Sequence, residues 1–322
     1  MSRIREALLR AEQERSKGDY NEALASLIGP ADDLVELSTT PAESAVDPAS
    51  ILDAVPGNRE VVFDKAGECD QAGGALSRVR HEEWFPAGTV CLNFESRDAV
   101  GTEEFRTLRS RLKHLAQKKP LKRLLISSTL PGEGKTFVAV NLAQVIAQQY
   151  GTRVLLIDAD LRRPAVHIAL GAPQRPGLTD YLSDNKLDEF QVLQTGSIPN
   201  LYLISAGKPS HHSTERLSGD RLGKLLAKVN DLFDWIIIDS PPALGLSDTS
   251  TISSVCDGVI MVAAAGSTPY ALAQKAQREF PVCPILGVIL NRVDASQTYG
   301  KYYYNYQSRG ENVKESGLSG GS

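Results

Sequence analysis

One ten-residue segment combines glycine, lysine and threonine in an order that suits phosphate binding. Residues 127–136 read SSTLPGEGKT and lie between a short apolar run and a longer amphipathic stretch. Gly132 and Gly134 let the backbone approach an anion closely, so that its N–H groups can point at phosphate oxygens. The Lys135 ammonium would reach the β- and γ-phosphates of a nucleotide, and the Thr136 hydroxyl would bind Mg²⁺. This order of residues predicts a P-loop.

The elements predicted on either side of the loop support this reading. A strand is predicted over residues 124–127 and a helix over 135–149, and the start of a helix adds its positive end to an anion site. The pattern is imperfect, because Thr129 stands where the first glycine of a P-loop is usual. The alternative is a glycine-rich turn that binds nothing.

Three further carboxylates follow two apolar runs. Asp158 and Asp160 come after LLI, and Asp239 comes after III. In an open parallel sheet, ligands bind beyond the carboxyl ends of the strands, so these aspartates and the loop should converge on one edge. Carboxylates beside a nucleotide can hold Mg²⁺ or take a proton from an attacking hydroxyl. The alternative is that each aspartate caps a strand end. Arg162 either clamps a phosphate or pairs with an acid, and the sequence leaves both open.

Strand and helix patterns alternate regularly after residue 101. Continuous Val, Ile and Leu runs predict strands that are covered on both faces, and their alternation with helices predicts a mostly parallel sheet. The fold class is therefore α/β, of the P-loop NTPase kind, with helices on both faces of the sheet. The predicted strands span 124–127, 154–157, 201–204, 235–238, 259–262 and 286–290, and the predicted helices span 104–115, 135–149 and 222–229.

The chain divides into four predicted regions. Residues 1–28 form a helical segment, 29–95 an acidic and largely disordered linker, 96–296 the P-loop domain, and 297–322 a tyrosine-rich tail that is also expected to be disordered. The 322-residue chain has a net charge of −4, which argues against a nucleic-acid binder. Its four cysteines form no CxxC pair, and no signal peptide or membrane span is recognisable, so a cytoplasmic protein is expected.

The tail concentrates half of the ten tyrosines within eight residues. Adjacent phenols cannot easily all be buried with hydrogen-bond partners, so a core role is poor chemistry. An aromatic binding patch and a set of hydroxyl nucleophiles both remain, and the nucleotide loop on the same chain favours the nucleophiles. Each phosphotyrosine would add about −1.5 to −2 charges. The residues concerned are Tyr299, Tyr302, Tyr303, Tyr304 and Tyr306.

Taken together, these features resemble the bacterial tyrosine kinases (BY-kinases) of capsule and exopolysaccharide synthesis, over about residues 95–306. The segment 131–136 resembles their Walker A motif, 157–162 their Walker A′ and 238–242 their Walker B. Glu103, Arg106 and Arg109 fit the E-x-x-R-x-x-R helix with which the family builds rings of subunits. Many members have N-P-x-E-L-L where this chain has residues 210–217, and that region departs from the family.

The resemblance implies ATP and Mg²⁺ as cofactors and phosphorylation of the tyrosine cluster, in trans between subunits. Lys135 and Thr136 would hold ATP and Mg²⁺, Asp160 and Asp239 would help to hold Mg²⁺, and Asp158 would be the base or orienter for the tyrosine hydroxyl, with the choice between Asp158 and Asp160 open. The implied nucleotide contacts are Pro131, Gly132, Glu133, Gly134, Lys135, Thr136 and Phe137, with Asn291 against the base.

The resemblance also implies partners. The stand-alone members need a membrane polysaccharide co-polymerase (a chain-length determinant) as activator, which recruits them to the inner face of the plasma membrane, and a cognate tyrosine phosphatase. The alternative function is a MinD/ParA-type switch ATPase without kinase activity, and a third is a scaffold that binds nucleotide without chemistry. Switch ATPases carry a second lysine where this chain has Leu130, so the kinase is favoured.

Overall fold

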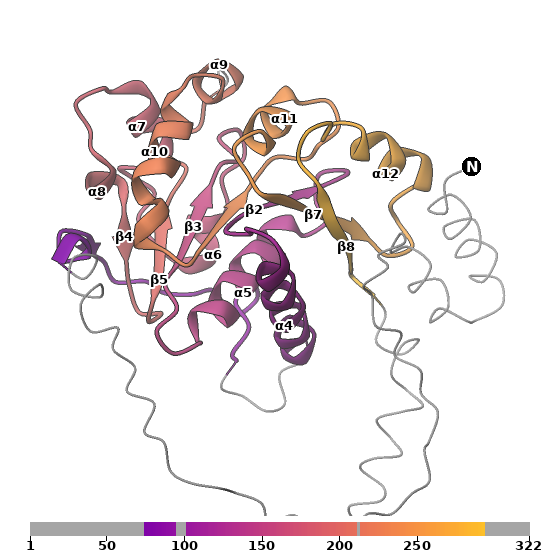
Figure 1. Ribbon diagram of the computed structural model, residues 1–322, viewed down its shortest axis with the longest axis horizontal. Coiled ribbons are helices and arrows are strands. Elements are labelled where there is room, and N and C mark those ends of the chain that lie inside the picture. The colour runs from indigo at the N-terminus through magenta and orange to yellow at the C-terminus, as the bar shows by residue number, and fades with distance from the viewer. Residues whose placement is uncertain (1–73, 95–100, 211–212, 294–322) are drawn as a thin grey trace, which may run out of the picture.

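A single twisted sheet organises the computed structural model, which describes residues 74–94, 101–210 and 213–293. Within these residues the sheet has eight strands in the order β1-β4-β5-β3-β6-β2-β7-β8 (Figure 1). Every neighbouring pair is parallel except β4 with β5. The strands are β1 (Arg80–His81), β2 (Arg123–Ser128), β3 (Val154–Asp158), β4 (Gln194–Thr195), β5 (Leu201–Ile204), β6 (Trp235–Asp239), β7 (Gly258–Ala264) and β8 (Ile285–Asn291).

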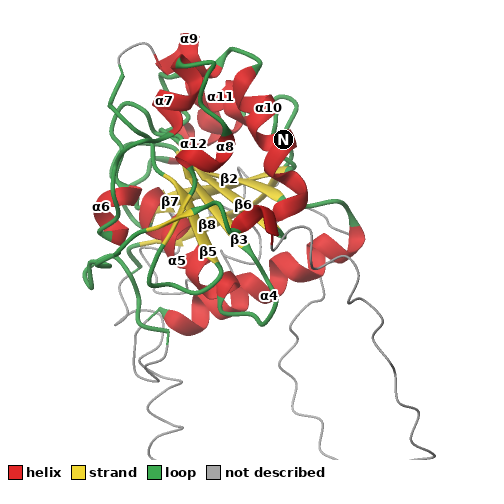
Figure 2. Cartoon of the chain, turned by 90° about the vertical axis from the view of Figure 1, so that its left-hand side faces the viewer, coloured by secondary structure: helices red, strands yellow, loops and turns green. Residues whose placement is uncertain are grey.

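Helices cover both faces of the sheet, which confirms the predicted fold class. In Figure 2, α4 and α5 lie below the strands and α7 to α12 lie above them. The helices are α4 (Thr102–Lys118), α5 (Lys135–Ala147), α6 (Val166–Leu170), α7 (Leu178–Ser183), α8 (Glu189–Val192), α9 (Ser213–Leu217), α10 (Arg221–Val229), α11 (Ser247–Ser253) and α12 (Tyr270–Gln277), with the 3₁₀ turn η2 (Asn230–Leu232).

The central strands are apolar at consecutive positions because each face meets its own core. Leu155, Ile157 and Ile236 point to the core under α7 to α12, whereas Leu156 and Ile237 point to the core under α4, α5 and α6. Alternate side chains of a strand face opposite sides, so a strand covered on both faces must be apolar throughout. The six strands predicted from the sequence are all present and differ only at their ends. Only the two-residue strands β1 and β4 escaped prediction, being too short for a pattern.

The prediction of a largely disordered linker is wrong for residues 74–94. Leu76 and Val79 pack in one core, β1 pairs with β4, and Trp84 and Phe94 pack in the other core. This segment therefore crosses the edge of the sheet from one face to the other. The buried apolar residues of this segment are separated by polar ones at irregular intervals. The sequence therefore shows no helix or strand period that would predict an ordered segment here.

Buried Asn141 of α5 fixes the end of this segment. Its side-chain oxygen accepts the N–H of Leu92 at 2.8 Å, and its amide nitrogen donates to the carbonyl oxygen of Val90 at 2.8 Å. A buried amide that satisfies two main-chain groups of a distant segment is a specific attachment, since leaving such groups unpaired is costly. Residues 90–92 are thereby held against the helix that follows the glycine-rich loop.

Three predicted features lie outside the described residues: the helical segment 1–28, most of the linker 29–95, and the tyrosine-rich tail. In the part of the chain that the structure describes, no helix is long and apolar enough to cross a membrane.

The last strand leaves one edge of the sheet open within the described residues. Strand β8 pairs with β7 alone, and its seven residues are partly exposed along their whole length. The opposite edge is formed by the two residues of β1. The two edges therefore differ in length and polarity.

Replacing Trp84 by Ala tests the placement of residues 74–94. The Trp84 side chain is 3% exposed and its indole N–H donates to Oε1 of Gln194 at 3.3 Å, so its loss should cost about 3–5 kcal/mol of folding free energy. Urea unfolding followed by circular dichroism measures this. The neighbouring Phe85, 71% exposed, is the control, and Phe85→Ala should change stability by less than about 0.5 kcal/mol. Equal, small effects of both variants would contradict the placement.

Candidate active site

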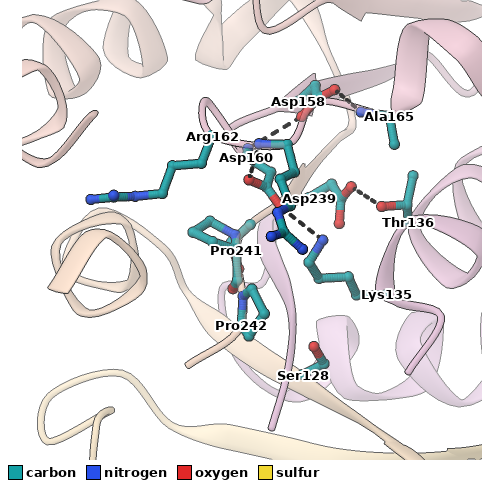
Figure 3. Close-up of polar contacts among 12 residues, drawn as sticks. Ser128, Lys135, Thr136, Asp158, Asp160, Arg162, Ala165, Asp239, Pro241 and Pro242 are labelled. Atoms are coloured by element: carbon teal, nitrogen blue, oxygen red, sulfur yellow. Dashed lines mark hydrogen bonds and ion pairs between the residues drawn. The ribbon is translucent and has the colours of Figure 1, made fainter. Parts of the chain in front are cut away.

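Three strand ends bring the predicted chemical groups together. Strand β3 pairs with β6 so that Asp158 lies directly beside Asp239, and β6 pairs with β2 so that Asp239 lies beside Ile126. Strand β2 leads directly into the glycine-rich loop. The parallel strands thus deliver the loop and the aspartates to one carboxyl edge, as predicted (Figure 3).

The loop takes a shape that only its glycines permit. Gly132 has φ of 82° and Gly134 has φ of 95°, in the left-handed region that other residues avoid. Helix α5 starts directly after Gly134, and no side chain caps its first turn. The first N–H groups of a 13-residue helix therefore remain available at the loop, and they favour an anion.

Lys135 is held by Asp160, opposite the loop. Its Nζ donates to Oδ2 of Asp160 at 2.9 Å, and both side chains are largely buried (Figure 3). Burial by itself lowers the pKa of Lys135, but the carboxylates of Asp239 and Asp160 outweigh it and raise the pKa above its ordinary value. The ammonium group therefore stays charged beside the loop, as phosphate binding requires.

Asp239 and Thr136 form the second contact across the site. The Thr136 hydroxyl donates to Oδ2 of Asp239 at 2.6 Å, while Oδ1 of Asp239 is buried without a hydrogen-bond partner. Burial raises the pKa of Asp239 to about 6, although Lys135 and the Thr136 hydroxyl act in the opposite direction. A buried carboxylate oxygen without a partner, next to a threonine hydroxyl, is the arrangement that a magnesium ion or its bound water would complete.

The site fits a metal ion that takes most of its ligands from water and from a bound substrate rather than from the protein. Among residues 74–94, 101–210 and 213–293, no group of three or more His, Cys, Asp or Glu is arranged to hold a metal ion. Mg²⁺ is usually held by one or two carboxylates, waters and substrate phosphates rather than by an all-protein cage. Thr136 and Asp239 supply that kind of partial ligand set.

Asp158 plays a different part from its neighbours. Its Oδ2 accepts the N–H groups of Ala165 and Val166 at 3.1 Å each, and its Oδ1 accepts the N–H of Asp160 at 3.2 Å. The carboxylate is completely buried, and burial and then the Asp239 charge raise its pKa well above the ordinary value. Both oxygens of Asp158 thus shape the turn that presents Asp160, whereas Asp160 faces Lys135.

Arg162 pairs with an acid, which decides between the two readings of the sequence. Its Nε donates to Oδ2 of Asp248 at 3.0 Å, and Asp248 also accepts the hydroxyls of Ser213 and Thr214. Figure 3 shows Arg162 directed away from Lys135 and Thr136. Sequence reasoning missed Asp248, because its partners lie 34 to 86 residues away.

The remaining predicted nucleotide contacts fall into two groups. Glu133 and Asn291 lie at the loop, since the Asn291 amide donates to the Glu133 carbonyl oxygen at 2.9 Å. Phe137 is partly exposed and packs against the core, with its ring 5.9 Å from that of Phe105. The loop residue Pro131 is exposed.

The three residues predicted for subunit assembly lie on α4 and make contacts within the chain. Arg106 bonds to Glu103 and donates to the Phe94 carbonyl oxygen at 2.8 Å. Arg109 donates to the Val145 carbonyl oxygen at 2.7 Å, close to the end of α5. Glu103 is exposed, and both arginines are partly exposed.

Known proteins resemble this chain in sequence over the residues that carry the loop and the aspartates. A family model described as an AAA domain matches residues 122–274. Tyrosine-protein kinase YwqD of Bacillus subtilis is 34% identical over 208 residues, which cover 63% of this chain and 87% of the relative. Tyrosine-protein kinase CpsD of Streptococcus agalactiae is 35% identical over 218 residues, which cover 66% of this chain and 93% of the relative.

A solved tyrosine kinase structure is also similar to this chain. The kinase domain of the Escherichia coli tyrosine kinase ETK is similar with a TM-score of 0.57 and 29% identity, covering 66% of this chain and 86% of that domain.

Asp239→Asn is expected to stabilise the protein without nucleotide by about 1–3 kcal/mol near neutral pH. The pKa of Asp239 is about 6 in the folded protein, against an ordinary value of 3.8. Above pH 6 the buried carboxyl is ionised, and this lowers the free energy of unfolding. The gain should shrink as the pH falls from about 6 to about 4, because the wild-type carboxyl then becomes neutral. Thermal unfolding midpoints at a series of pH values measure this.

Asp248→Asn is the matched control with the opposite sign. Burial raises the pKa of Asp248, but hydrogen bonds from Arg162, Ser213 and Thr214 lower it below its ordinary value overall. Its charge therefore stabilises the fold at neutral pH, and that contribution is lost as the pH falls through the lowered pKa. The control variant should unfold at a lower temperature than wild type near neutral pH. Destabilisation by both substitutions would contradict the electrostatics described for Asp239.

Proposed function

Since this chain belongs to the bacterial tyrosine-protein kinases, we propose that its glycine-rich loop binds ATP with Mg²⁺ and that its kinase activity acts on its own C-terminal tyrosines. The chain is a protein-tyrosine kinase, and its relatives do not favour the MinD/ParA-type switch ATPase as an alternative. The observation that carries the proposal is the convergence of Lys135, Thr136 and three aspartates on one sheet edge beside an uncapped helix start.

Phosphoryl transfer requires little covalent chemistry from the protein itself. Positioning and charge neutralisation are the main requirements. Lys135 and the first N–H groups of α5 would neutralise the phosphates, and Thr136 with Asp239 would hold Mg²⁺. The bound ion would supply further positive charge against the phosphates. The buried, unpartnered Oδ1 of Asp239 supports that role.

We assign the part of base or orienter for the tyrosine hydroxyl to Asp160 rather than Asp158. The ion pair of Asp160 with Lys135, at 2.9 Å, supports a position of its carboxylate next to the phosphate that Lys135 would bind. Both oxygens of Asp158 accept main-chain N–H groups, whereas Asp160 accepts the Arg163 N–H with one oxygen and bonds to the Lys135 ammonium with the other. Asp158 would therefore act as a positioning residue for the turn that carries Asp160.

The acceptors in this proposal are Tyr299, Tyr302, Tyr303, Tyr304 and Tyr306. Their density in a polar segment supports modification in succession by a neighbouring subunit. Each phosphate adds about −1.5 to −2 charges, so that repeated transfer would repel the tail from the acidic site and loosen the assembly.

The wider role follows from the resemblance to BY-kinases of capsule and exopolysaccharide synthesis. We propose that the kinase domain over residues 96–296 acts at the cytoplasmic face of the plasma membrane, with a membrane polysaccharide co-polymerase as activator and a tyrosine phosphatase as its counterpart. Regions 1–28 and 29–73 are the proposed partner contact.

Lys135→Met should abolish phosphate on the peptide containing Tyr299 to Tyr306, because the ammonium that neutralises the transferred phosphate is gone. Mass spectrometry of wild type and variant, both purified from the native host, measures the modified sites. Asp160→Asn should lower tail phosphorylation by at least about 100-fold, whereas Asp158→Asn should reduce it less.

Two outcomes would contradict this proposal. A wild-type tail without phosphate, in a protein that still hydrolyses ATP with a membrane fraction, would return the assignment to a switch ATPase. A larger loss of transfer in Asp158→Asn than in Asp160→Asn, at equal unfolding temperatures, would reverse the two aspartate roles.

The double substitution Arg106→Ala and Arg109→Ala should give smaller assemblies in light scattering. Both guanidinium groups lie on the partly exposed side of α4, where a neighbouring subunit would meet them. Because both also bond to main-chain oxygens of their own chain, the control is Arg111→Ala, an exposed residue on the same helix. Assemblies of unchanged size at unchanged stability would remove α4 from the proposed ring.

A further inference from the structure

The buried carboxylate of Glu133 is an unexpected group in a loop that should attract phosphate. Glu133 is 4% exposed and lies between Gly132 and Gly134. A negative charge at this position opposes the binding of an anion, because the two charges repel across a short distance. Its presence therefore calls for a structural role that offsets the repulsion.

The side chain of Glu133 closes the loop on itself and on a neighbouring turn. Its Oε2 accepts the N–H of Leu130 at 2.8 Å, and its Oε1 accepts the hydroxyl proton of Thr268. Thr268 lies between β7 and α12, and its own hydroxyl oxygen accepts the N–H of Ala264 at 2.9 Å. The single hydroxyl proton of Thr268 is thus directed at Glu133, for which a carboxylate is the suitable acceptor.

The main chain of Glu133 is held from a second strand. The Asn291 amide, at the end of β8, donates to the Glu133 carbonyl oxygen at 2.9 Å, and the Asn291 carbonyl oxygen accepts the N–H of Ala265 at 2.8 Å. A Cβ atom on Gly134 would lie 2.0 Å from the Asn291 amide nitrogen. The loop therefore presses against Asn291 as closely as a glycine allows.

We propose that Thr268 and Asn291 are positioning residues that act through Glu133 and fix the phosphate loop in its binding shape before a nucleotide arrives. Leu130, Glu133, Thr268 and Asn291 form one hydrogen-bonded circuit that joins the ends of β7 and β8 to the loop. A loop that is already ordered loses less conformational entropy on binding, so the circuit raises nucleotide affinity without touching the nucleotide. This inference rests on the proposed binding of ATP at the loop.

The test is the affinity of the full-length protein for ATP with Mg²⁺, measured by isothermal titration calorimetry. Thr268→Val removes the hydroxyl at nearly constant volume, and it should weaken ATP binding about 10-fold because a buried carboxylate loses its partner. Transfer at saturating ATP should stay within about two-fold of wild type, so that KM changes and kcat does not. Thr268→Ser should restore the affinity.

Two further variants separate this role from general stability. Thr251→Val is the control, because the Thr251 hydroxyl bonds only within its own helix, to the Ser247 carbonyl oxygen, and ATP affinity should be unchanged. Asn291→Ala removes the second attachment and should weaken ATP binding to a similar degree. In a Glu133→Gln background, Thr268→Val should have a smaller effect than in wild type, since the two residues act as a pair.

The outcomes distinguish this inference from the proposed function. Wild-type affinity in Thr268→Val, or an equal loss in the Glu133→Gln background, would overturn the circuit while leaving ATP binding in place. Loss of affinity in proportion to a lowered unfolding temperature, without rescue by serine, would also overturn it. Absence of Lys135-dependent ATP binding in the wild type would overturn the proposed function and this inference together.

Discussion

Three carboxylates are buried around one lysine at the end of the central strands, and the rest of the site depends on how this cluster is held. Charges of like sign at short range and away from water are unfavourable, and Lys135 offsets only part of that cost. The surrounding structure supplies the remainder. Two apolar cores clamp β3 and β6 from both sides, so that Asp158 and Asp239 are held side by side whatever their mutual repulsion. The fold is thus the means by which an unstable charge arrangement is maintained.

Within that arrangement, neighbouring aspartates have become chemically different. Asp158 is saturated by main-chain N–H groups, Asp160 bonds to an ammonium, and Asp239 has one oxygen without any partner. The differences come from the turn after β3 and the start of α5 rather than from the residues themselves. A carboxylate that builds a turn and a carboxylate that pairs with Lys135 therefore stand two positions apart.

The sheet and the convergence of loop and aspartates could be predicted from the sequence, because continuous apolar runs and glycine at defined positions have few physical explanations. Features that depend on long-range partners could not be predicted. Nothing in the sequence around Asp248 indicates that it binds Arg162 and Ser213. Likewise, nothing in the turn that contains Thr268 indicates its bond to Glu133. Residues 74–94 lack a repeating pattern because they run along an edge and touch each core only at separate points. The contact of Asn291 with the nucleobase stays a prediction, and the bond from its amide to the loop is a further long-range contact of this kind.

The two edges of the sheet differ in how readily each could pair with a strand of another molecule. The β1 edge is two residues long and carries arginine and histidine, so it offers little to another strand. Strand β8 offers seven residues, mostly apolar, and within the described residues its outer main-chain groups face no further strand. Unpaired, apolar edges of this length favour edge-to-edge pairing between molecules. Within the described residues, β8 is therefore the edge at which a strand of another molecule could add to the sheet.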